Sequence, residues 1–169
     1  HMDKTIGDML VELDDLGLRD NTIVVFASDN GADSYALPSP EFFKANGPLR
    51  GFKGQLYEGG VRIPAIARWP GHIAPNVKSD HMWYFSDIMP TFADAGGCAD
   101  RLPDGIDGLS FLPALTGQGT QAEHDLLYWE LWGDDLHRAV RKGKWKAIWP
   151  GEANAIELYD LDADLAESN

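Results

Sequence analysis

Three polar residues of this chain could act together on a charged ligand. Asp29 and Asn30 stand at the end of an apolar run over residues 22–28. Both side chains offer oxygen atoms, which are the ligands that a hard divalent cation prefers. Lys53 follows on the glycine-rich stretch 51–60 and supplies a positive charge for an anionic group.

The apolar run is the element that must position the first two of these residues. Residues 22–28, Thr-Ile-Val-Val-Phe-Ala-Ser, are rich in β-branched side chains. A continuous run of this kind predicts a strand that is buried on both faces, and therefore a parallel one. Parallel α/β sheets place their chemistry beyond the carboxyl ends of their strands, where Asp29 and Asn30 stand.

Two motifs of this region resemble one protein family. The sequence T-I-V-V-F-A-S-D-N-G over residues 22–31 and the pattern G-F-K-G-x-x-x-E-G-G-V-R-I-P over residues 51–64 look like those of the type I sulfatases. These are arylsulfatase-like enzymes of the alkaline phosphatase superfamily. The resemblance runs nearly end to end but covers only the carboxyl-terminal part of such an enzyme, so the chain is expected to be part of a sulfuric ester hydrolase.

The resemblance implies roles for individual residues. Asp29 and Asn30 match positions that bind a divalent cation in the family, usually Ca²⁺, although an isolated Asp-Asn-Gly is also a common turn. Lys53 matches the lysine that contacts the sulfate of the substrate, so it is expected to be catalytic and substrate-binding. His137 lies in a stretch that the family shows near its cleft, and we expect it on the substrate side.

The nucleophile of the family is not found in this sequence. Sulfatases use a formylglycine made from a cysteine or serine in a C/S-x-P-x-R context, and Cys98 is followed by Ala-Asp-Arg-Leu. Two side chains also supply only part of the ~6–8 oxygens that calcium takes. The chain is therefore expected to carry an incomplete calcium site, to bind Ca²⁺ weakly or not at all, and to have no sulfatase turnover alone.

Charge and composition limit the partners. The net charge of −13 argues against nucleic acid and against anionic membrane surfaces, because phosphate binding needs clustered Lys and Arg. The cations near the predicted site, Arg50, Lys53 and Arg62, still suit a sulfate ester. A lone cysteine excludes an intramolecular disulfide. The compartment of the whole protein, periplasmic, secreted or cytoplasmic, is left open.

The hydrophobic pattern predicts an α/β chain in two parts. The resemblance implies that residues 3–96 are the carboxyl-terminal part of a sulfatase catalytic domain, with a large mixed or parallel sheet. Residues 97–169 are expected to form a small antiparallel sheet with a helix. Predicted helices cover residues 3–16, 85–95 with Ser86 as N-cap, 110–115 and a start over 162–169; predicted strands cover 22–28, 61–69, 126–132, 138–141, 144–149 and 157–161.

Two other functions fit the same residues. The first is a non-catalytic binding module that associates with itself, because a strand over 22–28 without neighbours would expose two edges and exposed edges recruit other chains. This alternative predicts a strand-exchanged homodimer. The second is a phosphoesterase relative in the same superfamily. Trp129, Trp132, Trp145 and Trp149 fit either a carbohydrate-binding surface or packing of the small sheet, and the second interpretation is favoured.

Overall fold

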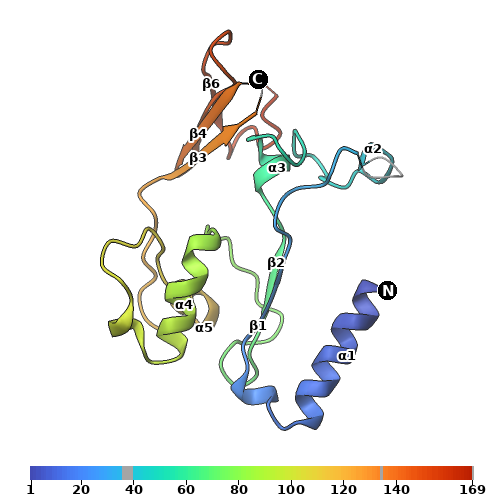
Figure 1. Ribbon diagram of the computed structural model, residues 1–169, viewed down its shortest axis with the longest axis vertical. Coiled ribbons are helices and arrows are strands. Elements are labelled where there is room, and N and C mark those ends of the chain that lie inside the picture. Colours follow the sequence, from blue (N-terminus) through green and yellow to red (C-terminus); the bar gives the residue numbers. More distant parts are fainter. Residues whose placement is uncertain (36–39, 134, 169) are drawn as a thin grey trace. The chain divides into compact units, whose positions relative to one another are not determined.

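The computed structural model describes residues 1–35, 40–133 and 135–168, and it confirms the predicted α/β fold. The chain forms two compact units. One unit comprises residues 1–26 and 66–123, and the other comprises residues 27–65 and 124–169 (Figure 1). Each unit therefore contains residues from both sides of position 97, and the predicted domain division at that position stays a prediction.

Helix α1, Met2–Asp15, opens the first unit and confirms the helix predicted from residue spacing. Gly17 follows it with a positive φ of 67°, a conformation that glycine adopts without a steric penalty. An ion pair of 3.3 Å between Arg68 Nη2 and Asp14 Oδ1 fixes the end of α1 to the end of strand β2, Ala65–Arg68.

Strand β1, Val24–Ala27, pairs with β2 in a two-stranded sheet. The backbone N–H of Ser28 donates to the carbonyl of Pro64, so the end of β1 meets the start of β2 and the strands run antiparallel. The strand is partly exposed rather than buried on both faces, and it pairs with β2 in the antiparallel direction, so the prediction of a parallel strand is wrong for this pair. The expectation of two unpaired edges is wrong, because β2 pairs with one of them.

The helix predicted over residues 85–95 divides into a short 3-10 helix, Phe85–Asp87, and α4, Ile88–Ala95. The predicted N-cap Ser86 is wrong, because the N-cap position of α4 belongs to Asp87. Asp87 is buried and accepts hydrogen bonds from the backbone N–H groups of Tyr84 and Leu109. The next α-helix, α5, spans Leu112–Thr116 and is followed by Gly117, where a helix is predicted over residues 110–115.

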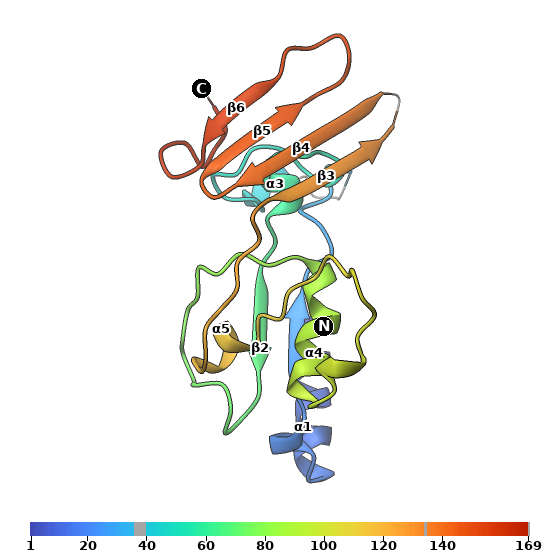
Figure 2. The same ribbon diagram turned by 90° about the vertical axis from the view of Figure 1, so that its left-hand side faces the viewer.

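The second unit contains a four-stranded antiparallel sheet in the order β3-β4-β5-β6 (Figure 2). Its strands confirm the four short strands predicted from the sequence. Lys142 and Trp145 pair across the β4–β5 hairpin, and Gly143 between them has a φ of 55°. The bounds are Leu127–Trp132 for β3, Leu136–Lys142 for β4, Trp145–Trp149 for β5 and Glu157–Asp160 for β6.

Two short helices belong to the same unit. Helix α2, Pro40–Phe43, lies in the long segment after the Asp-Asn-Gly turn. Helix α3, Glu58–Val61, was not predicted, and the strand expected over residues 61–69 is shortened to β2 as a result. Two consecutive glycines in α3 gave no helical signal, because glycine disfavours a helix interior.

The core of the second unit lies between the four-stranded sheet and the segment around α3. Ala139, Ile148 and Tyr159 from three neighbouring strands are buried together with Leu56, which precedes α3. Trp129 packs against this cluster, which agrees with the predicted packing role.

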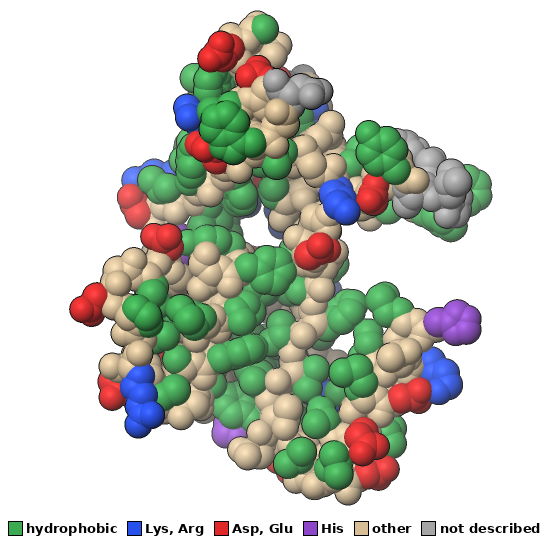
Figure 3. Space-filling view, viewed as in Figure 1, with side chains coloured by type: hydrophobic (Ala, Val, Ile, Leu, Met, Phe, Trp, Pro, Cys, Tyr) green, Lys and Arg blue, Asp and Glu red, His purple; other side chains and the backbone are tan. Residues whose placement is uncertain are grey.

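Other aromatic residues of the sheet do not pack in this core. Trp132 is 73% exposed and Trp145 is 48% exposed, so the core-packing interpretation does not hold for these two. Hydrophobic side chains are visible on the surface of both units (Figure 3).

No helix among the described residues is both long enough and apolar enough to cross a membrane. The helix start expected over residues 162–169 is wrong for 162–168, which form turns, while residue 169 lies outside the described residues.

Candidate functional site

The turn that carries Asp29 and Asn30 follows directly after β1. The hydroxyl of Ser28 donates to the backbone carbonyl of Asn30 over 2.7 Å. The backbone N–H of Gly31 donates to the carbonyl of Gly60 over 2.9 Å. The turn is therefore held both within itself and from the glycine-rich segment that carries Lys53.

Glycines allow this close approach of backbone segments. A Cβ atom on Gly31 would lie 1.7 Å from the carbonyl oxygen of Gly59. A Cβ on Gly60 would lie 2.0 Å from the carbonyl oxygen of Gln55, and one on Gly59 would lie 2.3 Å from that of Gly51. Such distances are far below a van der Waals contact, so a side chain cannot be accommodated at these positions. This explains the Gly-Gly that follows Glu58 in the family pattern.

Lys53 is held beside the same turn. Its backbone N–H donates to the carbonyl of Ala32 over 2.9 Å. Its ammonium lies 3.4 Å from Asp33 Oδ2, and both side chains are about half exposed. The structure therefore brings Lys53 to the predicted metal-binding turn, from which it is separated by more than twenty positions in the sequence.

Electrostatics couples the lysine to both aspartates. The hydrogen bond that Asn30 donates to Asp29 holds the pKa of the Asp29 carboxyl below its usual range, and the nearby Lys53 ammonium acts in the same direction. The backbone N–H of Tyr35 lowers the pKa of Asp33, again with help from Lys53. Both carboxylates are therefore charged at neutral pH beside one ammonium group.

Two contributors to this arrangement were missed in the sequence. Asp33 is the ion-pair partner of Lys53 and stands four positions after Asp29. Asn46 accepts from the backbone N–H of Ala32 over 3.1 Å and donates to the carbonyl of Gly51 over 2.7 Å. Its amide thus connects the segment after the Asp29–Asn30 turn to the start of residues 51–60, which we call the lysine loop. No sequence pattern signalled Asn46, whereas Asp33 could have been suspected from its closeness to Asp29.

A pocket of about 550 Å³ adjoins this region. Asn30 lines it from the turn, and Arg62 lines it from the residue after α3. Asp29 and Lys53 are not among its lining residues. The pocket therefore borders the candidate site on the side of Asn30. Its other lining residues are Ser28, Gly31, Ala32, Ala45, Asn46, Leu49, Ile63 and Pro64.

His137 belongs to a different element from Asp29, Asn30 and Lys53. It stands on β4 opposite Leu131, on the sheet face that also carries Ala139 and Arg141. Among the described residues, no hydrogen bond or ion pair joins His137 to Asp29, Asn30 or Lys53. The structure therefore places His137 on the inner face of the sheet without connecting it to the other predicted site residues.

The donor set fits part of a calcium site. Asp29 and Asn30 supply carboxylate and amide oxygens, which are the correct type for a hard cation. Within the described ranges, no group of three or more His, Cys, Asp or Glu side chains is placed to hold a metal ion. Asp29 and Asn30 thus have the right chemical type for a calcium ligand, and the calcium site stays a prediction.

This α/β fold carries an Asp-Asn-Gly turn beside a lysine on a glycine-rich loop. Two family models identify the class of protein to which it belongs. The model described as Sulfatase matches residues 1–98, and the model described as N-sulphoglucosamine sulphohydrolase, C-terminal, matches residues 52–169. The chain therefore belongs to the sulfatase family, which confirms the resemblance inferred from the two motifs.

Individual relatives support the same conclusion. Human arylsulfatase A is 38% identical over 98% of this chain and 32% of its own length. N-acetylgalactosamine-6-O-sulfatase of Bacteroides thetaiotaomicron is 35% identical over 99% of the chain and 36% of its own length. The solved structure of BT4656 in complex with its substrate D-glucosamine-2-N,6-O-disulfate has a TM-score of 0.78 and 28% identity, and the match covers 99% of this chain and 33% of that one. The chain spans about a third of these relatives.

Proposed function

We propose that Asp29, Asn30 and Lys53 form one side of the sulfate-ester site of a sulfuric ester hydrolase. The reaction converts a sulfate ester and water into an alcohol and sulfate. The observation that supports this proposal best is the position of Lys53, which contacts Ala32 and Asp33 just after the turn and helps to lower the pKa of Asp29. A metal ligand and an anion-binding cation are thereby combined at one turn.

Asp29 and Asn30 are the residues that would hold Ca²⁺. A bound calcium ion supplies positive charge that stabilises a sulfate oxygen. The charged state of Asp29 favours this role, because its hydrogen bond from Asn30 keeps its pKa low. The remaining calcium ligands are not assigned to residues of this chain.

Lys53 would bind a sulfate oxygen through its ammonium group. A fixed positive charge at this place also offsets negative charge that develops on the leaving group. Asp33 holds the same ammonium at 3.4 Å, so a sulfate group has to compete with this carboxylate or share the lysine with it. The nucleophile is not assigned here, since no cysteine or serine of the sequence stands in a C/S-x-P-x-R context.

The first experiment is an anion titration of the whole chain, followed at the backbone amide NMR resonances of residues 29–33 and 51–60. Inorganic sulfate is expected to shift these resonances, and Lys53→Ala is expected to remove the binding. Lys142→Ala is the matched control, because Lys142 is also an exposed lysine paired with one aspartate, Asp125, at 2.9 Å. Sulfate binding that persists in Lys53→Ala, or that Lys142→Ala weakens equally, would contradict the proposal.

Inorganic phosphate in the same titration tests the phosphoesterase alternative. Preference for sulfate supports the sulfatase assignment, whereas clear preference for phosphate favours the phosphoesterase relative. Hydrolysis of a chromogenic aryl sulfate, with and without calcium, then tests catalysis. Turnover that is lost in both Lys53→Ala and Asp29→Ala would show that this chain contains a nucleophile outside a C/S-x-P-x-R context.

A further inference from the structure

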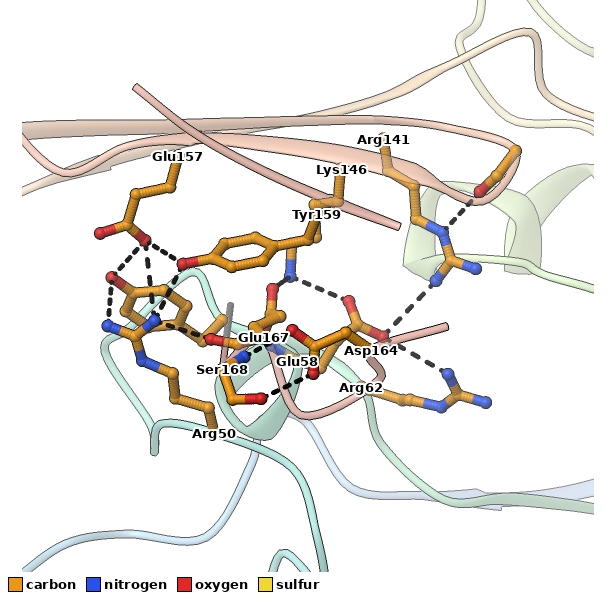
Figure 4. Close-up of polar contacts among 12 residues, drawn as sticks. Arg50, Glu58, Arg62, Arg141, Lys146, Glu157, Tyr159, Asp164, Glu167 and Ser168 are labelled. Atoms are coloured by element: carbon orange, nitrogen blue, oxygen red, sulfur yellow. Dashed lines mark hydrogen bonds and ion pairs between the residues drawn. The ribbon is translucent and has the colours of Figure 1, made fainter. Parts of the chain in front are cut away.

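A cluster of buried charges lies between the four-stranded sheet and the lysine loop. The Lys146 ammonium, from β5, lies 2.9 Å from Glu58 Oε1 and 2.9 Å from Glu167 Oε1 (Figure 4). Lys146 and Glu167 are completely buried, and Glu58 is 1% exposed. Lysine and glutamate side chains are almost never fully buried unless they are paired, so the burial of these three residues depends on their mutual ion pairs.

Glu58 connects this cluster to the end of the lysine loop. It is the first residue of α3, five positions after Lys53. Its backbone N–H donates to Glu167 Oε2 over 2.6 Å. Its second carboxylate oxygen lies 3.5 Å from Arg62 Nη1 and 3.5 Å from Arg141 Nη1. Glu58 is thus fixed through both its backbone and its side chain.

Arg50 connects Glu167 to the start of the lysine loop. Its guanidinium donates to the backbone carbonyl of Glu167 over 2.9 Å and to the hydroxyl of Tyr159 over 2.9 Å. Its carbonyl accepts from the backbone N–H of Gly59 over 2.7 Å, which closes the loop on itself. Both ends of the segment from Arg50 to Glu58 are therefore attached to Glu167 (Figure 4).

The segment that holds Glu167 is itself well ordered by local contacts. The backbone N–H of Asp164 donates to the carbonyl of Asp160 over 2.7 Å. Asp164 in turn accepts hydrogen bonds from the backbone N–H and the hydroxyl of Ser168, over 2.7 and 2.9 Å. These turns hold the Glu167 side chain beside the Lys146 ammonium.

We propose that Lys146, Glu58 and Glu167 are positioning residues for Lys53. The buried Lys146 ammonium joins the carboxylate at the end of the lysine loop to the carboxylate of the C-terminal turns. This connection holds the loop, and with it the Lys53 side chain, beside the metal-binding turn. The effect on sulfate binding rests on the function proposed for Lys53, whereas the effect on the order of the loop does not.

Hydrogen exchange of the whole chain tests the proposal. Lys146→Met removes the charge and keeps most of the stem. Glu167→Gln removes a charge but keeps an oxygen that can accept from the Glu58 N–H. In both variants, amides of residues 51–60 are expected to exchange about tenfold faster, while amides of β4 and β5 change by less than about twofold. Lys146→Arg, which restores the charge, is expected to recover part of the protection.

Lys144→Met is the matched control, because Lys144 forms a 2.6 Å ion pair with Asp160, and among the described residues no hydrogen bond or ion pair joins its side chain to residues 51–60. It should leave exchange in residues 51–60 unchanged. If Lys146→Met does not fold, Glu167→Gln still decides the question. Equal acceleration in the loop and in β4 and β5 would show a general structural role and overturn the proposal, as would unchanged exchange in the loop.

Sulfate titration of the same variants separates this inference from the proposed function. If the wild-type chain binds sulfate at Lys53, the positioning role predicts weaker sulfate binding in Lys146→Met and Glu167→Gln, with partial recovery in Lys146→Arg. If the wild-type chain does not bind sulfate there, the proposed function fails. The exchange of residues 51–60 still decides whether the buried cluster orders the loop.

Discussion

The ammonium of Lys53 lies 3.4 Å from Oδ2 of Asp33, and the backbone of Lys53 donates to the carbonyl of Ala32. The lysine that we propose as the sulfate contact is therefore already paired with a carboxylate. This pair is about half exposed, so its energy is small, but it acts on the same group that would bind the substrate.

Asp33→Asn should strengthen sulfate binding. The new amide can still accept from the backbone N–H of Tyr35, so the local turn is kept, while the charge that competes for Lys53 is removed. Exposed ion pairs contribute up to about 1 kcal/mol, which corresponds to an increase in affinity of up to about fivefold. A sulfate titration checks this, and weaker binding in Asp33→Asn would mean that the carboxylate orients Lys53.

Gly31→Ala should strongly destabilise the chain. Its Cβ would lie 1.7 Å from the carbonyl oxygen of Gly59, so the backbone must move. Overpacking of this kind typically costs about 1–3 kcal/mol in the free energy of unfolding, and this clash with backbone atoms places Gly31→Ala at the upper end of that range. Urea unfolding measures the change.

Gly7→Ala is the control for this substitution. Gly7 lies within α1, and its added Cβ would meet no atom within 4 Å apart from its chain neighbours and the helix's own backbone, so alanine should stabilise the helix by about 0.5–1 kcal/mol. Similar free energies of unfolding for Gly31→Ala and Gly7→Ala would contradict the predicted close approach of the two backbone segments.

Stability at alkaline pH should depend on Tyr159. Burial and a hydrogen bond to Glu157 raise the pKa of Tyr159 to about 12. In the unfolded chain the tyrosine ionises near pH 10, so between about pH 10 and 12 the unfolded state holds fewer protons and the folded state loses stability as the pH rises. The loss should approach about 2–3 kcal/mol, as two pKa units imply.

Unfolding measured by urea at pH 9 to 12 tests this dependence. Tyr159→Phe removes the titrating group, so its free energy of unfolding should fall less steeply than that of the wild type over the same range. Tyr57, which also donates to Glu157, has a pKa raised by burial and should retain a smaller dependence. An identical slope in Tyr159→Phe and the wild type would show that the alkaline loss arises elsewhere.

Calcium should bind to this chain only weakly. Asp29 and Asn30 supply a minority of the ~6–8 oxygens that calcium takes, so we expect an affinity no better than about millimolar. Calorimetric titration at neutral pH provides the measurement. Micromolar affinity that disappears in Asp29→Ala would show that this chain supplies a complete set of ligands.

Self-association remains a prediction that sedimentation can test. Pairing with β2 covers one edge of β1, and a strand with an open edge recruits other chains. We therefore expect a dimer formed by strand exchange at micromolar concentration, with a dimer fraction that falls on dilution. A sharp monomer across the whole concentration series would count against this partner.

The residues that sequence alone identified are those with a local signal. The three- and four-residue spacing of apolar side chains predicts α1, and alternation around a Lys-Gly turn predicts the β4–β5 hairpin. The motifs around Asp29 and Lys53 were sufficient to identify the sulfatase family, since each is contiguous in the chain. Such features depend on neighbouring residues, which the sequence displays directly.

Other features were decided only by the tertiary structure. Lys146 and Glu58 are separated by 88 positions, and Glu58 and Glu167 by 109, so no periodicity could pair them. Helix α3 was missed because Gly59 and Gly60 oppose helix formation locally, and close backbone packing overrides that preference. Burial determines whether a charged residue stays on the surface or enters a buried ion pair, and burial depends on which distant segments the fold brings together.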